Sequence, residues 1–295
     1  RDQPRSRGLG DVYKRQDMAP ATVQRYKTSL KHTRDFVWET YHKKDVLLDE
    51  VSRQFIEDYE FWLKTEKKCC HNTATKYLKN FKKIIRIALA KGWMKNDPFL
   101  EIRFSLDKVE PDFLEDSEIQ KLISKEIDIP RLSQVRDIFV FCCFTGLAFS
   151  DIHGLRKEHI VEDSNGVRWI RKGRQKTKIM CNIPLMEIPL KILEKYSTNE
   201  YCKKHGVLFP VLCNQKMNAY LKELADICGI KKTLTTHVGR HTFATFALTN
   251  GVSIESVAKM LGHTNVQMTR HYARVLDRTV IREMSQIKMD FHISI

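Results

Sequence analysis

The side chains of this sequence that are best suited to chemistry begin with a short motif in its last third. His237 and Arg240 are three residues apart, so on a helix they share one face. Thr235 or Thr236 can cap that helix, which places the pair in its first turn. The free N–H groups and the dipole of a helix N-terminus favour an anion, most obviously a phosphate. The motif therefore predicts a phosphate site.

Two further motifs follow at short spacing. A second helix start is expected at Gly262-His263, which supplies another imidazole, and Tyr272 comes nine residues after His263. The surroundings of Tyr272 are basic, with Arg270, His271 and Arg274 beside it. An arginine, imidazoles and a tyrosine around one phosphate could transfer a phosphoryl group to the tyrosine.

In this order and at this spacing the three motifs resemble the C-terminal signature of the tyrosine recombinases, the phage-integrase family. The resemblance runs from about residue 17 to the end of the chain. It implies a site-specific DNA recombinase, or integrase, that cleaves and rejoins DNA strands through a covalent phosphotyrosyl intermediate. The implied fold is mostly α with a small antiparallel β-sheet (α+β): an N-terminal helical core-binding (SAM-like) domain and a C-terminal catalytic domain.

The resemblance also assigns roles to single residues. Tyr272 is the expected nucleophile, and the fork of Arg240 is expected to stabilise the pentacovalent transition state. His237 and His263 are expected to hydrogen-bond the phosphate or to handle a proton, since imidazoles titrate near neutral pH. His241 is i, i+4 from His237, but a metal pair is not favoured because no HExxH glutamate accompanies it. We expect His241 to pack against or orient its neighbours.

The general acid is expected on a basic hairpin. In the family this lysine lies eight residues before the proline that ends the following strand. Lys176 lies eight residues before Pro184 and matches, with Lys172 as the alternative. Lys172 is in any case a candidate DNA contact.

One position departs from the family pattern. The first family arginine normally follows Thr-Gly-Leu, and Ala148 stands there instead. Arg174 is our candidate replacement, because it lies two residues before Lys176 and alternate residues of a strand share a face. Asp151, where the family has an acidic residue, is expected either to orient a site residue or to cap a helix. Weaker candidates for the missing cation are Arg156, Arg131 and Arg136.

Composition agrees with a polyanionic partner. The 295 residues carry a net charge of +15, and 42% of them are hydrophobic, enough for packed cores. The sequence has no 18-residue apolar run and no visible signal peptide, so no membrane span is expected. The eight cysteines form no CxxC pair and there is no Walker loop, so neither a metal nor another cofactor is predicted. Reduced cysteines fit a cytoplasmic protein, here one associated with the bacterial nucleoid.

Three segments are expected along the chain. Residues 1–16 read like a translated library adapter and are set aside as non-native. Residues 17–103 should form the core-binding domain, with helices over 21–41, 52–67 and 72–91. A basic stripe on the third helix is a predicted phosphate-tracking face, made of Lys76, Lys79, Lys83 and Arg86.

Residues 112–295 should form the catalytic domain. Asp116 or Ser117 is expected to cap its first helix, an apolar helix is predicted over 131–145, and strands with an Asn165-Gly166 turn over 158–185. A last helix over 273–289 resembles the family tail that docks onto a neighbouring protomer; packing onto its own domain is the alternative.

The resemblance implies double-stranded DNA, a homo-tetramer and accessory DNA-bending proteins as partners. The Thr-Gly-Leu-Ala variant is similar to integrases of Bacteroidetes mobile elements. Two alternatives stay open: a catalytically weakened DNA-binding relative, suggested by Ala148, and a type IB topoisomerase-like activity.

Overall fold

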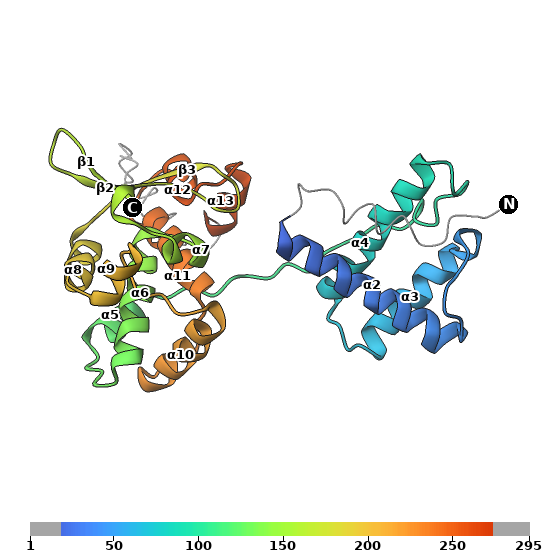
Figure 1. Ribbon diagram of the computed structural model, residues 1–295, viewed down its shortest axis with the longest axis horizontal. Coiled ribbons are helices and arrows are strands. Elements are labelled where there is room, and N and C mark those ends of the chain that lie inside the picture. The colour runs from blue at the N-terminus through green and yellow to red at the C-terminus, as the bar shows by residue number, and fades with distance from the viewer. Residues whose placement is uncertain (1–18, 274–295) are drawn as a thin grey trace, which may run out of the picture. The chain divides into compact units, whose positions relative to one another are not determined.

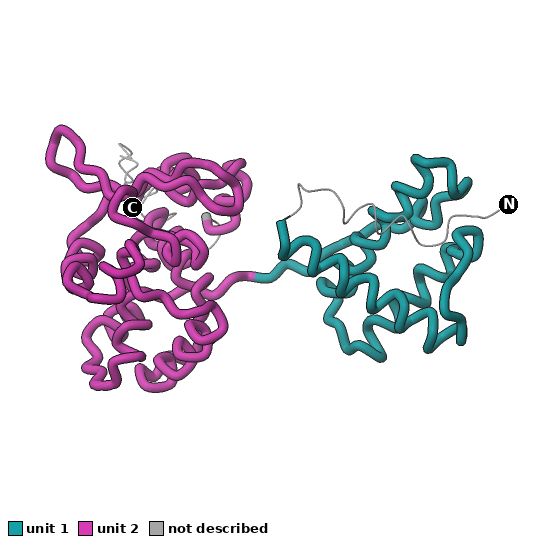
Figure 2. Tube along the Cα trace, in the orientation of Figure 1, with its two compact units in different colours: residues 1–109 teal, residues 110–295 magenta. Residues whose placement is uncertain are grey.

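The computed structural model describes residues 19–273 of the chain. The predicted non-native segment 1–16 and, apart from its first residue, the predicted last helix over 273–289 lie outside this part. The chain divides into two compact units, residues 1–109 and 110–295 (Figure 2). None of the helices in the described part is long and apolar enough to cross a membrane.

The first unit is built from three helices around an aromatic core. They are α2 (Pro20–Tyr41), α3 (Arg53–Thr65) and α4 (His71–Ala90), with a short 3-10 turn at Leu48–Glu50. All three predicted helices are confirmed to within two residues at each end. Phe36, Tyr59 and Phe99 are fully buried at the centre of the core. The Ser52 hydroxyl caps α3 by accepting from the Phe55 amide at 3.3 Å.

Helix α4 is amphipathic in the way its sequence predicts. Its buried face includes Leu78, Ile85 and Ala88. All members of the basic stripe are solvent-exposed: Lys76, Lys79, Lys83 and Arg86. Both properties follow from the 3.6-residue period of an α-helix.

The second unit combines helices with one small sheet (Figure 1). Its strands are β1 (Ile160–Glu162), β2 (Arg168–Gly173) and β3 (Met180–Pro184), in the antiparallel order β1-β2-β3. In the register of the β2–β3 pair, Ile170 lies opposite Ile183 and Lys172 opposite Cys181. The predicted turn is present, because Asp163 Oδ1 accepts from the Asn165 and Val167 amides and Gly166 has φ +76°.

The helices of this unit pack around α6 (Pro130–Thr145). It contacts α5, α8, α10 and α11 and is buried along almost its whole length, so its sequence is apolar rather than striped. Gly146 ends it in a left-handed conformation at φ +66°. The other helices are α5 (Asp116–Ser124), α7 (Phe149–His153), α8 (Glu187–Tyr196), α9 (Glu200–His205), α10 (Asn214–Ile227), α11 (Thr236–Thr249), α12 (Ile254–Leu261) and α13 (Gln267–Ala273), with a 3-10 turn at Lys157–His159.

The predicted cap of α5 was wrong. The helix begins at Asp116 after Glu115, so neither Asp116 nor Ser117 is its N-cap. The Glu118 carboxylate instead reaches back and accepts from the Glu115 amide at 2.9 Å. In a capping box the side chain of the third helical residue accepts from the amide of the N-cap residue in this way.

Candidate active site

The start of α11 carries the His-x-x-Arg motif: His237 lies in the first turn, as expected, and Arg240 is the fifth residue of the helix, just beyond that turn. Thr235 is the N-cap, and its hydroxyl accepts from the Val238 amide at 3.4 Å. Arg240 is 2% exposed, and its two terminal nitrogens donate to the carbonyls of Gly146 and Leu261, both at 2.6 Å. These bonds fix the plane of the guanidinium and leave its remaining N–H groups for a ligand.

Tyr272 lies on α13, beside α11. Its ring is buried against the apolar cluster that includes Phe243 and Leu261, and its hydroxyl lies 3.0 Å from His241 Nδ1. Burial raises the pKa of Tyr272, while the positive charges of Arg240 and then Arg174 act to lower it. The predicted nucleophile is therefore within the electrostatic reach of two guanidinium groups.

His263 reaches the same place from a helix end, which corrects one expectation. No helix starts at Gly262-His263: Leu261 is the last residue of α12, and Gly262 caps it in the left-handed conformation at φ +61°. Such a glycine is a common helix terminator, because it has no side chain to oppose a positive φ. His263 Nδ1 lies 2.8 Å from Thr269 Oγ1, and its ring is nearly parallel to that of Tyr272 at 6.5 Å between centroids.

Arg174 enters the site from the β2–β3 hairpin. It is 8% exposed, its Nε lies 3.5 Å from Asp151 Oδ2, and this nitrogen has no hydrogen-bond acceptor among the described residues. A side chain at Gly262 would leave no room for it, because an added Cβ would come within 2.9 Å of Arg174 Cδ and 2.7 Å of Cys181 Sγ. The glycine of the Leu-Gly-His motif thus gives Arg174 its place.

The strand argument that led to Arg174 was wrong, because β2 ends at Gly173 and residues 175–177 form a turn. The Arg174 amide donates to the Ile179 carbonyl, and its carbonyl accepts from the Lys178 amide, both at 2.8 Å. The turn cancels strand alternation, so Arg174 is buried while Lys176 is exposed.

Asp151 connects α7 to this hairpin. It is 2% exposed, and its Oδ1 accepts from the Gln175 amide at 2.9 Å while Oδ2 faces Arg174. One buried carboxylate therefore holds both the side chain of Arg174 and the backbone that follows it. This is the orienting contact anticipated for Asp151; the N-cap of α7 is Ala148.

The two lysine candidates differ in their surroundings. Lys176 is exposed, and its charge, with those of Arg240 and Arg174, adds to burial in lowering the pKa of His237. Lys172 is half-buried and donates to the Gly154 carbonyl at 2.8 Å. Its own pKa is lowered, chiefly by burial. Lys176 is thus exposed and close enough to act on His237, whereas the amine of Lys172 is engaged within its own domain.

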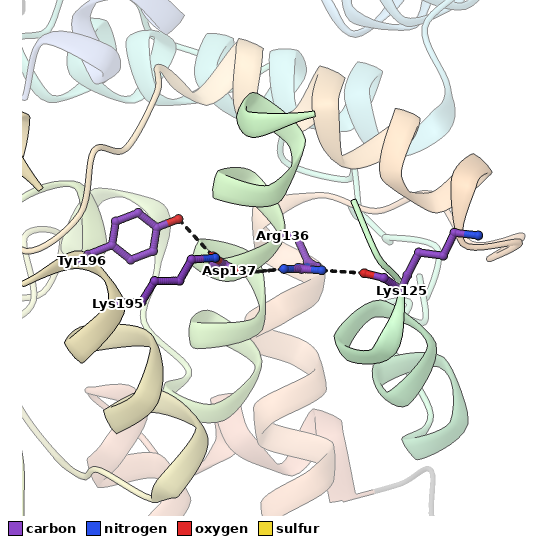
Figure 3. A network of polar contacts seen from close by, with 5 residues as sticks. All are labelled: Lys125, Arg136, Asp137, Lys195 and Tyr196. Atoms are coloured by element: carbon purple, nitrogen blue, oxygen red, sulfur yellow. Dashed lines mark hydrogen bonds and ion pairs between the residues drawn. The ribbon is translucent and has the colours of Figure 1, made fainter. Parts of the chain in front are cut away.

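The weaker candidates for the missing cation are engaged elsewhere. Arg131 pairs with Glu223 on α10. Arg136 donates to Asp137 and to the carbonyl of Lys125, in a network in which Asp137 also accepts from Lys195 at 2.6 Å and Tyr196 at 3.1 Å (Figure 3). Arg156 is exposed and precedes β1, and its charge contributes to lowering the pKa values of Lys172 and His159. Among the arginines considered, Arg174 is the one whose charge reaches Arg240 and Tyr272.

The site is short of negative charge. Burial, followed by the field of Arg174, lowers the pKa of Arg240 to about 10. Burial and the neighbouring arginines lower the pKa of His263 to about 4. Asp151 pairs with Arg174 and also acts to raise the pKa of Arg240, but one carboxylate does not balance two guanidinium groups. An entering phosphate would therefore offset repulsion between these two cations.

His241 was expected to pack against or orient its neighbours, and sequence reasoning gave it no chemical role. Its Nδ1 faces the Tyr272 hydroxyl, and its ring lies edge-on to that of His237 at 4.5 Å between centroids. The available signal is helical spacing. His241 lies four positions after His237, so the two imidazoles share one face of the helix. That signal is weak alone, because many helical histidines satisfy it. No group of three or more potential metal ligands occurs within the described residues.

Known proteins share this architecture. The model of the phage integrase SAM-like domain matches residues 11–106, and that of the phage integrase family matches residues 112–279. Tyrosine recombinase XerD of Shewanella oneidensis is 24% identical over 290 residues, covering 94% of this chain and 93% of the relative.

Two solved structures have the same fold. Lambda integrase residues 75–356, a dimer bound to a COC′ core site, is 17% identical with a TM-score of 0.72, over 90% of this chain and 93% of that one. The Tn1549 transposon integrase, in complex with a circular intermediate DNA, is 17% identical with a TM-score of 0.69, over 95% and 98% of the two chains. The chain belongs to the phage integrase family and is a tyrosine-type site-specific recombinase.

Proposed function

We propose that this recombinase cleaves DNA with Tyr272 and holds the reacting phosphate between Arg240 and Arg174. The Tyr272 hydroxyl oxygen bonds to phosphorus as the bond from phosphorus to a deoxyribose oxygen breaks. The phenol loses its proton, and the leaving oxygen gains one from Lys176. Because the phosphotyrosyl ester keeps the energy of the original bond, the reverse reaction rejoins strands without a cofactor.

The observation that carries this proposal is the meeting of two buried guanidinium groups with a buried tyrosine. Arg240 and Arg174 are 2% and 8% exposed, and both act on the pKa of Tyr272. Buried arginines with free N–H groups are suited to the charge that spreads over phosphate oxygens in phosphoryl transfer. His237 and His263 complete the set of donors around the same phosphate.

Arg174 resolves the difficulty raised by Ala148. We assign it the role of the missing family arginine, supplied from the hairpin instead of from the turn before α7. Asp151 supports this role, since it orients the guanidinium at 3.5 Å and fixes the following amide at 2.9 Å. If Arg174 acts in this way, Ala148 is no longer a reason to regard the protein as a catalytically weakened DNA-binding relative.

The first unit is proposed to grip DNA through the basic stripe of α4. Four exposed cations on one helical face can follow the phosphates of a duplex. Lys172 remains a predicted DNA contact, although its bond to the Gly154 carbonyl would have to be shared or broken.

The wider setting is also a proposal. Double-stranded DNA is the substrate, in line with the DNA-bound neighbours of the same fold. We propose assembly as a homo-tetramer on two duplexes, assisted by accessory DNA-bending proteins, on nucleoid DNA of a bacterial cytoplasm. Service to a mobile element is supported by the similarity to a transposon integrase.

A denaturing gel tests the reaction. The protein is incubated with a nicked suicide substrate, which traps the covalent intermediate because the cleaved fragment diffuses away. We expect a protein–DNA adduct that disappears in Tyr272→Phe and persists in Tyr201→Phe, a matched change at an exposed tyrosine on α9. Tight DNA binding without an adduct would instead indicate the non-catalytic relative. Relaxation of supercoiled DNA without recombinant product would indicate the topoisomerase-like alternative.

A further inference from the structure

One imidazole of the site has a contact that none of the roles above uses. His241 Nδ1 lies 3.0 Å from the Tyr272 hydroxyl, within hydrogen-bond range. The contact joins α11 to α13; Tyr272 is buried and His241 is half-buried, so the contact is partly shielded from bulk water. It is the closest described polar contact of the oxygen that must lose a proton when Tyr272 attacks.

The protonation state of His241 suits this contact. Burial, followed by the electrostatic effects of His237, His271 and Arg240, lowers its pKa to about 4. The ring is therefore neutral at pH 7 and carries one N–H and one free lone pair. With the proton on Nε2, the lone pair of Nδ1 points at the phenol and accepts its hydrogen bond.

The other two imidazoles of the site are placed less well for this task. His263 Nδ1 is already paired with Thr269 Oγ1 at 2.8 Å, and its ring is stacked parallel to the tyrosine ring rather than pointing at its oxygen. The ring of His237 contacts that of His241 edge-on, and the charge of Lys176 lowers the pKa of His237. His237 therefore lies toward the hairpin, on the side of the leaving group. The geometry thus separates a nucleophile side from a leaving-group side.

We propose that His241 is the general base of strand cleavage. As the Tyr272 oxygen bonds to phosphorus, the phenol proton passes to His241 Nδ1, and an imidazolium faces the new ester. In the rejoining step this imidazolium returns the proton to the tyrosine oxygen as the oxygen–phosphorus bond breaks. The assignment rests on the proposed function, since it supposes that Tyr272 is the nucleophile.

The charges around the two side chains explain why the transfer waits for DNA. In the protein alone the pKa of Tyr272 is raised and that of His241 is lowered, so the proton stays on the phenol. A bound phosphate anion offsets the arginine fields, which makes the imidazolium less costly. The phenol also becomes far more acidic as its oxygen joins phosphorus. The base is therefore effective only when the substrate is in place.

Two substitutions separate a base from a positioning residue. His241→Asn keeps an oxygen acceptor close to the place of Nδ1 but cannot take up a proton, whereas His241→Ala removes both. Single-turnover cleavage of the suicide substrate should slow by about 10²-fold or more in both variants, the usual effect of losing a general base. His205→Ala, at an exposed histidine on α9, is the matched control and should cleave normally. Cleavage by His241→Asn within about threefold of the unsubstituted rate would overturn the proposal.

A more acidic nucleophile gives a test that does not depend on variant stability. Replacing Tyr272 by a fluorinated tyrosine lowers the phenol pKa, so the need for a base falls. Fluorination should raise the cleavage rate in the His241→Ala background. This increase should be at least about tenfold larger than the change that fluorination causes when His241 is present, because the lost general base is worth more than that. Equal effects in both backgrounds would show that His241 only positions the ring, and the proposal would be wrong.

A substrate with sulfur in place of the leaving oxygen distinguishes the two proton transfers. A thiolate leaves without protonation, so this substrate should rescue Lys176→Ala but not His241→Asn. Rescue of His241→Asn would place His241 on the leaving-group side and refute its role as base. If the unsubstituted protein forms no adduct at all, the proposed function fails; if it forms one and the His241 variants match it, the inference alone fails.

Discussion

Removing Arg174 should slow DNA cleavage strongly while changing DNA affinity little. Arg174→Ala deletes a guanidinium that is 8% exposed and whose charge acts to lower the pKa of Tyr272. Losing one donor to transition-state charge costs about 3 kcal/mol, a loss on the order of 10²–10³-fold in cleavage rate. DNA binding should change by only a few-fold, because most phosphate contacts lie elsewhere.

The structure also predicts a cost in stability that must be kept apart from the rate. Arg174→Ala leaves the Asp151 carboxylate buried at 2% exposure without its ion-pair partner, which can cost about 3 kcal/mol of folding free energy. The double variant Arg174→Ala with Asp151→Asn removes the unpaired charge and keeps an acceptor for the Gln175 amide. It should recover most of the stability in thermal unfolding and none of the cleavage rate.

Suicide-substrate cleavage under single-turnover conditions is the assay, with two comparisons. Arg131→Ala removes an arginine that is paired with Glu223 at the surface, so it should cleave normally. Ala148→Arg in the Arg174→Ala background returns a guanidinium to the family position and should restore part of the rate. Cleavage by Arg174→Ala within about fivefold of the unsubstituted protein would refute the assignment of Arg174, since one lost donor should cost far more.

Three other features of the structure give shorter predictions. Gly262→Ala should lower both stability and the cleavage rate, because its Cβ would come 2.9 Å from Arg174 Cδ. Gly229→Ala is the control: it is also at positive φ but has open space around it, so in thermal unfolding it should lower stability alone, by about 1 kcal/mol. Lys79→Ala on the basic stripe should weaken DNA binding and reduce the slope of log affinity against log salt by about 1, whereas an unchanged slope would remove that lysine from the interface. The free energy of unfolding, measured with urea, should fall as pH drops from about 6.5 towards 4. The reason is that imidazoles such as that of His263, whose pKa is about 4 when folded, protonate first in the unfolded chain. His263→Asn should make the dependence of this free energy on pH flatter, and an unchanged dependence would contradict the lowered pKa.

Much of the fold was predictable because its signals are periodic. The three helices of the first unit and the apolar helix α6 appear as predicted, and both faces of α4 are as expected. The hairpin turn at Asn165-Gly166 is present because its chemistry is local. In each case the residues that determine the element are neighbours in the sequence.

The errors occurred where a single backbone angle or a distant contact decides the outcome. Gly262 can stand near either end of a helix, and its positive φ, which the sequence does not reveal, makes it the terminator of α12. Arg174 and Lys176 read as alternate strand residues, but the strand stops one residue earlier. The hydrogen bond of His241 to Tyr272 spans 31 positions, so local spacing could not disclose it.

The central claim is that Tyr272 becomes esterified to DNA, and peptide mapping of the trapped adduct tests it most directly. The adduct is digested with nuclease and then with protease, and the peptides that carry a residual nucleotide are sequenced by mass spectrometry. The nucleotide should be found on the peptide that contains His271-Tyr272-Ala273, attached to the tyrosine. A nucleotide attached to any other side chain would contradict the claim.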